Sequence, residues 1–306
     1  MKYRRLGRTN LKVSVVGIGT LQYGGEWGKS FTVKDVEQIL HHGQDLGFNL
    51  VDTGPGYGDQ VAEKLVGEAL KGRRHDWVLA TKFGRKYDPE KKFVRKEVWD
   101  VEGVRKMLDE SLRCLQTDYI DLYQFHSGRD EVFNNDELWD MLAQQVKAGK
   151  IRHLGISLME SDIQYQTDSA LRVGASVIQA RYNRLQREPE KGVFPACIRD
   201  DLGVLARVPL ACGLLGGKYK PGMTFDSDDV RSMLFQGKLE AALAQVQEIQ
   251  NEVPEGISMA QWALAWCLRN DAVTAAIPGY KDTAQLESAA KVGSEMVSKD
   301  HPRAWK

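Results

Sequence analysis

FNLVDTGPGYG, residues 48–58, joins an apolar run to a glycine-rich turn that carries an acid, Asp52, and a phenol, Tyr57. The apolar run is typical of a buried β-strand, and the glycines after it are typical of a turn. Seven more short Val/Ile/Leu-rich runs occur along the chain, with longer amphipathic segments between them. This alternation indicates repeated βα units around a parallel sheet.

Eight segments of the chain are candidate strands. They are VVGIGT (15–20), FNLVDT (48–53), WVLATK (77–82), IDLYQFH (120–126), IRHLGIS (151–157), VIQARY (177–182), VLARVPL (204–210) and AVTAAIPG (272–279). Helices are expected between them, for example over 33–47, 101–115 and 137–150. In the last of these segments apolar residues recur at helical spacing, and Gly149 stands where a C-terminal cap would.

Eight strands with intervening helices predict an α/β protein of the (β/α)8 TIM barrel type. An open doubly wound sheet is the alternative, but the sequence after the first strand, GIGTLQYGG (17–25), lacks the G-x-G-x-x-G spacing of that fold. Residues 1–14 are expected to form a short β-hairpin that closes the barrel bottom. Because no linker or low-complexity run interrupts the chain, we expect one domain over 1–306.

The composition excludes several classes of function. The 42 basic residues balance the 42 acidic ones, which favours neither nucleic acid nor a membrane surface as a partner. No apolar run approaches the roughly 20 residues that span a bilayer, and no signal peptide is evident. The cysteines are far apart and lack metal-ligand spacing, so we expect reduced thiols in a cytoplasmic protein. They are Cys114, Cys197, Cys212 and Cys267.

Three polar residues follow one another at the ends of neighbouring predicted strands. Asp52 ends the second strand, Lys82 the third and His126 the fourth, while Tyr57 follows in the loop after the second. Active sites of such barrels lie at the carboxyl ends of the strands. We therefore expect these four side chains to meet at one mouth.

These residue types together suit proton transfer to a carbonyl oxygen. A phenol has an ordinary pKa of about 10, and a neighbouring ammonium group favours its ionised form. Lys82 would supply the ammonium, and Asp52 would keep it charged in a buried site. His126 could donate a hydrogen bond to the carbonyl while Tyr57 transfers the proton. The set predicts reduction of a carbonyl or oxidation of an alcohol.

An ordered series of motifs resembles the aldo-keto reductase superfamily over nearly the whole chain. The matching segments are GFNLVDTGPGYG with Glu63 and Gly67 after it, ATKFG, TDYIDLYQFH, KAGKIRHLGIS, PLACGLLGGKY and IPGYKDTAQLE. The resemblance implies a catalytic tetrad of Asp52, Tyr57, Lys82 and His126. It also implies hydride transfer with a nicotinamide cofactor, NADP(H) in preference to NAD(H), and no metal.

The resemblance further implies which residues contact the cofactor. Ser157 and Gln179 would hold the nicotinamide carboxamide, Arg231 would close over the phosphates, and Lys281 would bind the 2′-phosphate, with Gln285 towards the adenosine. A cation and a helix N-terminus both favour that dianion. The remaining implied contacts lie in or just after the seventh strand and at the end of the eighth: Arg207, Pro209, Leu210, Gly213, Lys218 and Gly279.

The chain departs from the family pattern in three respects. Leu158 follows Ser157 where asparagine is common, and Arg207 stands where an aromatic ring usually stacks on the nicotinamide. A guanidinium can stack on a π-face, although its charge disfavours the oxidised ring. Ser288 and Ala289 replace residues that often meet the adenine.

The leading function is an NADP(H)-dependent oxidoreductase that interconverts a small-molecule carbonyl (an aldehyde, ketone or sugar) and an alcohol. A cofactor-binding regulatory subunit, as in the potassium-channel β subunits, is the alternative. A metal-dependent hydrolase is disfavoured because the strand ends lack a His/Asp cluster. Neither the natural substrate nor the oligomeric state follows from the sequence.

The segments expected around the mouth of the barrel lead to further predictions. The charged segment 85–100 is expected to be a solvated loop or part of a substrate lid. Trp27, Trp99 and Phe125 are candidate pocket aromatics. The short tail HPRAWK (301–306) suggests a pocket with little C-terminal enclosure.

Overall fold

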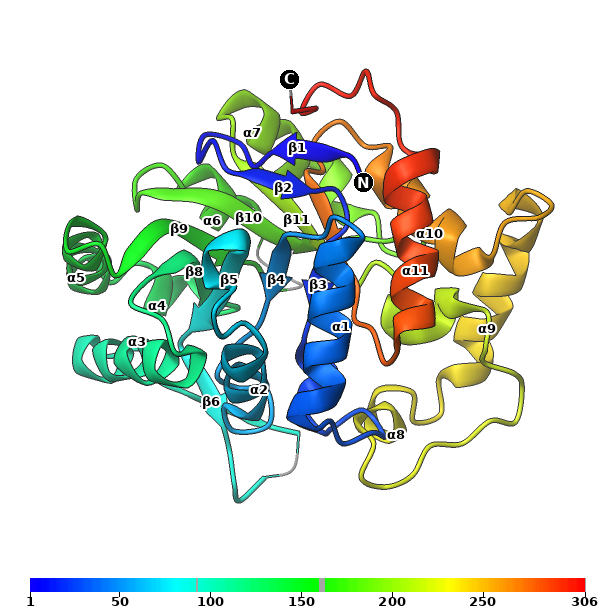
Figure 1. The fold of residues 1–306 in the computed structure, drawn as a ribbon, viewed down its shortest axis with the longest axis horizontal. Helices are drawn as coiled ribbons and strands as arrows, with labels where there is room; N and C mark the ends of the chain where they lie inside the picture. The colour runs from blue at the N-terminus through cyan, green and yellow to red at the C-terminus, as the bar shows by residue number, and fades with distance from the viewer. Residues whose placement is uncertain (92, 160–162, 306) are drawn as a thin grey trace.

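A curled parallel sheet forms the centre of the molecule (Figure 1). The computed structural model describes residues 1–91, 93–159 and 163–305. Within these residues the sheet has eight strands in the order β12-β11-β10-β9-β8-β5-β4-β3. Its two edges meet, because Val16 pairs with Ala276 and Gly19 with Gly279 through isolated parallel bridges. The predicted (β/α)8 barrel is confirmed.

Two strands of the barrel have the bounds that the sequence predicts, and the others are shifted or shorter. The sheet strands are β3 (Ile18–Gly19), β4 (Leu50–Asp52), β5 (Val78–Phe83), β8 (Ile120–His126), β9 (Ile151–Ser157), β10 (Ala175–Arg181), β11 (Gly203–Arg207) and β12 (Ala275–Ile277). The first and last strands are the most shortened, since the ladder between them consists only of isolated bridges.

Helices follow the strands and cover the outside of the barrel (Figure 1). The α-helices are α1 (Val33–Asp45), α2 (Val61–Ala69), α3 (Val101–Leu115), α4 (Asp130–Phe133), α5 (Asp136–Lys147), α6 (Ile163–Asp168), α7 (Val193–Arg199), α8 (Val230–Leu234), α9 (Leu239–Glu248), α10 (Met259–Leu268) and α11 (Thr283–Lys291). Shorter helical turns are η1 (Leu21–Gly24), η2 (Arg74–Asp76), η3 (Glu188–Lys191), η4 (Ala211–Gly216), η5 (Gln250–Glu252) and η6 (Val292–Met296).

The helix ends show why these segments are helical. Asp100 precedes α3 and accepts a hydrogen bond from the backbone N–H of Gly103, which is a typical N-cap. Beyond α5, Gly149 has a φ of 79°, the left-handed conformation predicted for this C-terminal cap.

An N-terminal hairpin closes one end of the barrel, as predicted. Strands β1 (Tyr3–Arg5) and β2 (Lys12–Ser14) pair antiparallel. Leu6 and Val13 are fully buried and belong to the same apolar cluster as barrel residues such as Leu122. In Figure 1 this hairpin lies at the top, beside both termini, while β6 (Arg85–Tyr87) and α8 lie at the bottom.

The barrel interior changes from apolar to polar along several strands. Side chains alternate between inside and outside, so Leu122, Gln124 and His126 share one face of β8, and Leu50 and Asp52 share one face of β4. The apolar members fill the end closed by the hairpin. The polar members therefore gather at the carboxyl ends, where the predicted site lies.

The segment 85–100 differs from the expected loop. It contains an antiparallel hairpin, β6 (Arg85–Tyr87) and β7 (Arg95–Glu97), which projects from the end of β5. Lys92 of this segment and Lys306 of the C-terminal tail lie outside the described residues. No helix in the described ranges is long and apolar enough to span a bilayer.

Candidate active site

The four residues of the predicted tetrad come together at the carboxyl ends of β4, β5 and β8. These strands are neighbours in the sheet, and Lys82 lies opposite Gln124, two residues before His126. Asp52 ends β4 and His126 ends β8. The barrel geometry thus delivers side chains from three strands to one small volume.

Asp52 and Lys82 form a buried ion pair. Nζ of Lys82 lies 2.5 Å from Oδ1 of Asp52 and also donates to the carbonyl oxygen of Thr53 at 2.7 Å. Only 1% of the Lys82 side chain and 5% of the Asp52 side chain are exposed. Burial alone would lower the pKa of Lys82, but the Asp52 carboxylate and the Tyr57 phenol outweigh it and raise that pKa. The Asp52–Lys82 pair therefore favours the charged, ammonium form of Lys82.

The Tyr57 ring lies close to both Lys82 and His126. The Lys82 ammonium is 5.0 Å from the centre of the Tyr57 ring. The Tyr57 and His126 rings meet edge to face, with centroids 6.2 Å apart and planes at 86°. The loop after β4 turns back through Gly54, whose Cα faces the same phenol ring. The phenol ring thus has both the ammonium group and the imidazole as neighbours.

His126 is held as a neutral imidazole. Burial, and then the positive charges of Lys82, Arg85 and further arginines, lower its pKa well below the ordinary value. Among the described residues, none hydrogen-bonds to its buried Nδ1 atom. A neutral imidazole carries one N–H group, which can donate a hydrogen bond to a carbonyl oxygen.

Gln124 completes the site and was missed by the sequence reasoning. Its Nε2 donates to Oδ2 of Asp52 at 3.0 Å, and its Oε1 accepts from Nε2 of Gln179 at 3.1 Å. Gln179 also donates to Oδ2 of Asp52 at 2.8 Å, and its Oε1 accepts from Oγ of Ser157 at 3.3 Å. The implied nicotinamide-binding pair is therefore connected directly to the ion pair. The sequence feature that could have identified Gln124 is its position two residues before His126, which places both side chains on the same face of the strand.

A second buried acid lies behind the site. Glu63 of α2 is fully buried and accepts a hydrogen bond from Thr81 at 2.6 Å. Burial raises the pKa of Glu63 to about 7, although its hydrogen bonds and the nearby charge of Lys82 act to lower that pKa. Thr81 precedes Lys82 on β5 and faces the helices, so Glu63 contacts the outer side of the strand that carries the ammonium.

The loop after β11 holds several of the implied cofactor residues. Arg207 ends the strand and donates to the carbonyl oxygen of Leu158 at 3.0 Å. Pro209 is buried and Leu210 half-buried, while Lys218 is exposed at the end of the loop. Gly213 has a φ of 97°, and a methyl group there would lie 2.3 Å from the hydroxyl of Tyr219. Only glycine fits this position.

A second cluster of implied cofactor residues lies around the loop after β3. Nζ of Lys281 donates to the carbonyl oxygen of Trp27 at 2.7 Å, and Arg231 reaches the same oxygen at 3.4 Å. Arg231 also forms an ion pair with Asp229. Gln285, in the first turn of α11, accepts from the backbone N–H of Lys281 at 3.0 Å.

This cluster has the chemistry of a phosphate site. Burial and the positive charges of Arg231, Lys29 and Lys218 lower the pKa of Lys281, although Asp229 opposes them. Cations that crowd one another in this way gain from a bound anion. The N-terminus of α11 adds the positive end of a helix dipole. Gly279 lies beside it without a side chain, against the amide of Gln22.

Of the aromatic residues predicted to line the pocket, not all lie on the side of the barrel where the pocket was expected. Phe125 is fully buried on the outer face of β8, where it packs against Trp99 and Phe133, so its assignment to the pocket was wrong. It alternates with His126, and adjacent residues of a strand point to opposite faces. Trp27 is half-buried, and its backbone carbonyl is part of the cluster around Lys281.

The described ranges contain neither a metal-binding cluster nor a disulfide. No group of three or more His, Cys, Asp or Glu side chains is placed there to hold a metal ion. None of the four cysteines, all of which lie in these ranges, forms a disulfide.

Comparison with known proteins gives concordant matches. The model of the aldo/keto reductase family matches residues 15–306. The chain is 30% identical over 301 residues to the aldo-keto reductase YhdN of Bacillus subtilis, covering 95% of this chain and 88% of that protein. It is also 30% identical over 298 residues to the NADP(+) aldo-keto reductase yakc of Schizosaccharomyces pombe, covering 93% and 84%. The solved structure of the glycerol dehydrogenase AKR11B4 from Gluconobacter oxydans matches with a TM-score of 0.81 and 30% identity, covering 95% of this chain and 90% of that one.

Proposed function

The chain belongs to the aldo/keto reductase family of oxidoreductases that act on carbonyl compounds, and from that premise we propose that it interconverts a small carbonyl compound and its alcohol with NADP(H). Tyr57 is the general acid of the reduction and the general base of the reverse reaction. The substrate is an aldehyde, ketone or sugar of the cytoplasm.

The observation that carries this proposal is the placement of Tyr57 against a lysine whose charged form Asp52 favours. Lys82 is buried, paired with Asp52 and 5.0 Å from the Tyr57 ring. As the phenol gives up its proton, negative charge develops on its oxygen, and a fixed ammonium in a site of low dielectric stabilises that charge. Such pre-placed charge is what a proton-transferring tyrosine needs near neutral pH.

The remaining side chains orient the reacting oxygen. His126 is neutral and can donate one hydrogen bond to the carbonyl, which fixes that oxygen beside Tyr57. Gln124 and Gln179 hold the second oxygen of Asp52, so the carboxylate stays aligned with Lys82.

The cofactor residues fit a nicotinamide dinucleotide phosphate. Ser157 and Gln179 would hold the carboxamide beside the tetrad, and Lys281 and Arg231 would hold the 2′-phosphate and pyrophosphate. When bound, the cofactor supplies or accepts the hydride. The preference for NADP(H) over NAD(H) is supported by the crowded cations around Lys281 and by the yakc relative, whose name specifies NADP(+).

The test is an absorbance assay at 340 nm with a panel of aldehydes, ketones and sugars, run with NADPH and with NADH. We expect turnover with NADPH, slower turnover with NADH, and a loss of at least about a hundredfold in kcat for Tyr57→Phe, because the proton donor is removed. Tyr119→Phe is the control. Tyr119 precedes β8 at the opposite end of the barrel and stacks on Arg74 and Arg152.

Two results would overturn the assignment. Near-normal turnover by Tyr57→Phe would remove Tyr57 from the proton transfer. Tight binding of NADPH without turnover of any carbonyl would instead favour a cofactor-binding regulatory subunit.

A further inference from the structure

The turn over 54–58, which carries Tyr57, packs against two segments from elsewhere in the chain. A methyl group on Gly56 would lie 3.1 Å from Cδ and 3.2 Å from Nε of Arg95, a residue of β7. A methyl group on Gly24, in the loop after β3, would lie 2.7 Å from the carbonyl carbon of Tyr57. The β6–β7 hairpin and the loop after β3 therefore both contact this turn, at the residue before Tyr57 and at Tyr57 itself.

An ion pair between Arg95 and Glu26 ties these two segments to each other. Both terminal nitrogens of Arg95 donate to the Glu26 carboxylate, one to each oxygen, and the Nη1–Oε1 distance is 3.2 Å. Only 16% of the Arg95 side chain and 12% of the Glu26 side chain are exposed. A paired guanidinium–carboxylate contact fixes the relative orientation of its partners as well as their distance. The turn is thus part of a closed ring of contacts that runs through Gly56, Arg95, Glu26, Gly24 and Gly58.

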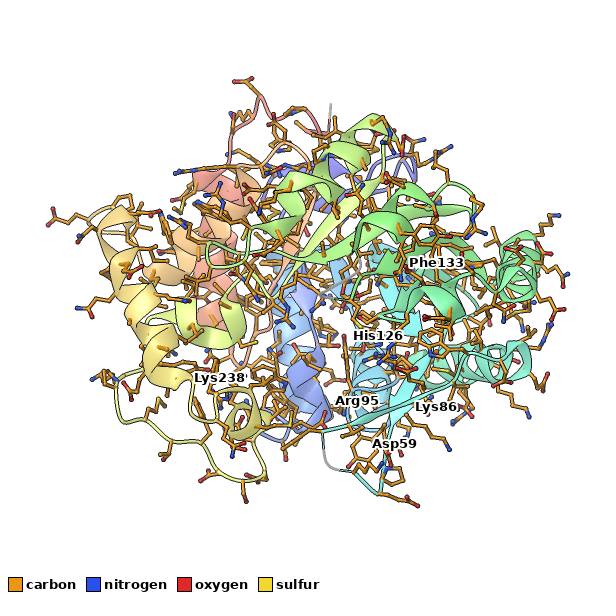
Figure 2. The ribbon with its side chains drawn as sticks, turned by 180° about the vertical axis from the view of Figure 1, so that it is seen from behind. Asp59, Lys86, Arg95, His126, Phe133 and Lys238 are labelled. Atoms are coloured by element: carbon orange, nitrogen blue, oxygen red, sulfur yellow. The ribbon has the colours of Figure 1, made fainter. Side chains whose placement is uncertain are left out.

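The same hairpin is attached to the strand that carries His126. Arg85, on β6, donates to the carbonyl oxygen of Ser127, the residue after His126, at 2.9 Å. In Figure 2 Arg95 and His126 lie near each other, and the positive charge of Arg95 contributes to the lowered pKa of His126. The hairpin therefore connects the turn of Tyr57 with the end of β8, so that it fixes one member of the tetrad relative to another.

We propose that Arg95 and Glu26 are positioning residues, whose ion pair clasps the turn that carries Tyr57. This inference rests on the proposed function, in which Tyr57 transfers the proton. Arg95 and Glu26 act only through the backbone of the turn and the ring of contacts around it. Because a misplacement of about 1 Å can slow a reaction by about a hundredfold, release of the turn should lower kcat while the binding of NADPH is kept.

The charges of the pair provide a second route to the tetrad, and the two routes differ in the sign of their effects. Glu26→Gln makes the surroundings of His126 more positive, whereas Arg95→Gln makes them less positive. An influence through charge alone would therefore shift the pH profile of kcat in opposite directions in the two variants. Loss of the clasp instead lowers kcat in both variants at every pH.

A double-mutant cycle tests the clasp. NADPH oxidation at saturating carbonyl gives kcat for the wild type, Glu26→Gln, Arg95→Gln and the variant with both changes. We expect roughly a tenfold loss in each single variant and the same loss in the double variant, because either change breaks the same contact. The KM for NADPH should stay within about twofold of the wild type. Arg95→Lys, which keeps the charge without the paired contact, should keep only part of kcat.

Three outcomes would overturn the proposal. They are a wild-type kcat in both single variants, opposite shifts of the pH profile without a common loss, and additive losses that reach about a hundredfold in the double variant. If a single variant does not fold, the double variant still reports the loss of the clasp, because it leaves no buried charge unpaired.

The pair of Arg5 and Asp201 is the matched control. Its guanidinium also binds both oxygens of a carboxylate, at 2.7 and 2.8 Å, but Arg5 lies on β1 at the closed end of the barrel. Arg5→Gln and Asp201→Asn should therefore keep the wild-type kcat. If these variants lose as much kcat as Arg95→Gln does, the effect is a general consequence of breaking an ion pair, and the proposal is wrong.

A measurement without turnover separates this inference from the proposed function. Protein labelled with 3-fluorotyrosine gives a fluorine NMR spectrum in which Tyr57→Phe identifies the Tyr57 resonance. That resonance should move in the same direction in Glu26→Gln and Arg95→Gln and stay in place in Arg5→Gln. A resonance that is unmoved in both variants of the clasp overturns the inference. If it moves as expected while Tyr57→Phe keeps near-normal turnover, the proposed function fails and the clasp stands.

Discussion

Asp52 has both carboxylate oxygens occupied by buried donors. Oδ1 accepts from Lys82, and Oδ2 accepts from Gln124 and Gln179. A carboxylate held from three directions cannot rotate away from the lysine. We regard Gln124 as a positioning residue, since it acts on Tyr57 only through Asp52 and Lys82.

Gln124→Leu should therefore weaken both the fold and the reaction. It removes one charge-assisted hydrogen bond and leaves the amide of Gln179 without one acceptor, which we expect to lower the free energy of unfolding by roughly 1–3 kcal/mol. We also expect kcat to fall about tenfold, since small misplacements of catalytic groups are costly. Urea denaturation and the pH profile of kcat measure the two effects.

Gln166→Leu is the matched comparison. Gln166 is equally buried and donates to Gly128 O at 3.0 Å and to Asp130 at 2.8 Å. Its loss should cost similar stability while the pH profile of kcat keeps its shape. If Gln124→Leu loses stability but keeps the wild-type kcat and profile, Gln124 has only a structural role.

The sequence predicts the residues of the tetrad better than the network around them. Asp52, Lys82 and His126 are recognisable because each is a polar residue at the end of an apolar strand. Gln124 lies inside such a run, between Tyr123 and Phe125, where the sequence does not say which face is the barrel interior. That face is set by the pleat and by strand register, which also explains why Phe125 was assigned to the wrong side.

At the scale of elements, the turn that carries Tyr57 packs backbone to backbone against the loop after β3. Gly58 has a φ of 62°, and a methyl group there would lie 2.2 Å from the carbonyl oxygen of Gly24. A methyl group on Gly24 would in turn lie 2.6 Å from the backbone nitrogen of Gly58. Two glycines at this contact therefore determine how closely Tyr57 approaches the barrel.

Gly58→Ala should damage both stability and activity. The left-handed conformation costs about 1 kcal/mol for a residue with a side chain, and the clash with backbone adds roughly 1–3 kcal/mol. Relief of the clash would move Tyr57, so we expect kcat to fall by more than tenfold. Thermal unfolding and NADPH oxidation provide the measurements.

Gly25→Ala separates the two contributions. Gly25 also has a left-handed φ, of 85°, but a methyl group there meets nothing within 4 Å. This variant should lose about 1 kcal/mol and keep its kcat. Equal behaviour of the two variants would show that the contact with Gly24 does not position Tyr57.

The β6–β7 hairpin shows which elements the sequence does not reveal. Its strands read RKY and RKE, in which both faces are charged or polar. The alternation of apolar and polar residues that signals a strand is therefore absent. The hairpin is stabilised by tertiary contacts, such as that of Arg95 with Glu26, which no local pattern can predict.

At the scale of the whole molecule, the two ends of the barrel have different tasks. One end is filled by apolar side chains and closed by the β1–β2 hairpin, and the other carries the polar groups. Stability and activity should therefore respond separately to changes at the two ends, as is usual for this fold.

Leu6→Ala tests this separation. Leu6 is fully buried at the closed end and lies against Gly203 of β11. We expect the free energy of unfolding to fall by roughly 2–4 kcal/mol, with kcat at 25 °C within about twofold of the wild type. Leu171→Ala, at a 44% exposed position, should change neither quantity. A large loss of kcat in Leu6→Ala would show that the two ends are coupled.

The barrel itself is predictable because eight apolar runs recur between helical segments. The bounds of β8 and β9 follow from the sequence, since each is paired on both sides over most of its length. The bounds of β3 and β12 do not, because apolar residues such as Val16 and Val273 continue beyond the short stretch that pairs in the ladder. An apolar run in the sequence indicates that a segment is buried, whereas the length of a strand depends on how many of its residues pair with a neighbouring strand.

The meeting of β3 with β12 also sets an order of events during synthesis. Every tetrad residue lies within the first 126 positions, but the wall that encloses them is joined only when Ala276 and Gly279 pair with Val16 and Gly19. A nascent chain emerging from the ribosome thus carries a full set of reactive side chains for more than half of its elongation, without an enclosure to arrange them. The last strand to be translated is therefore the one that completes the wall around the predicted tetrad.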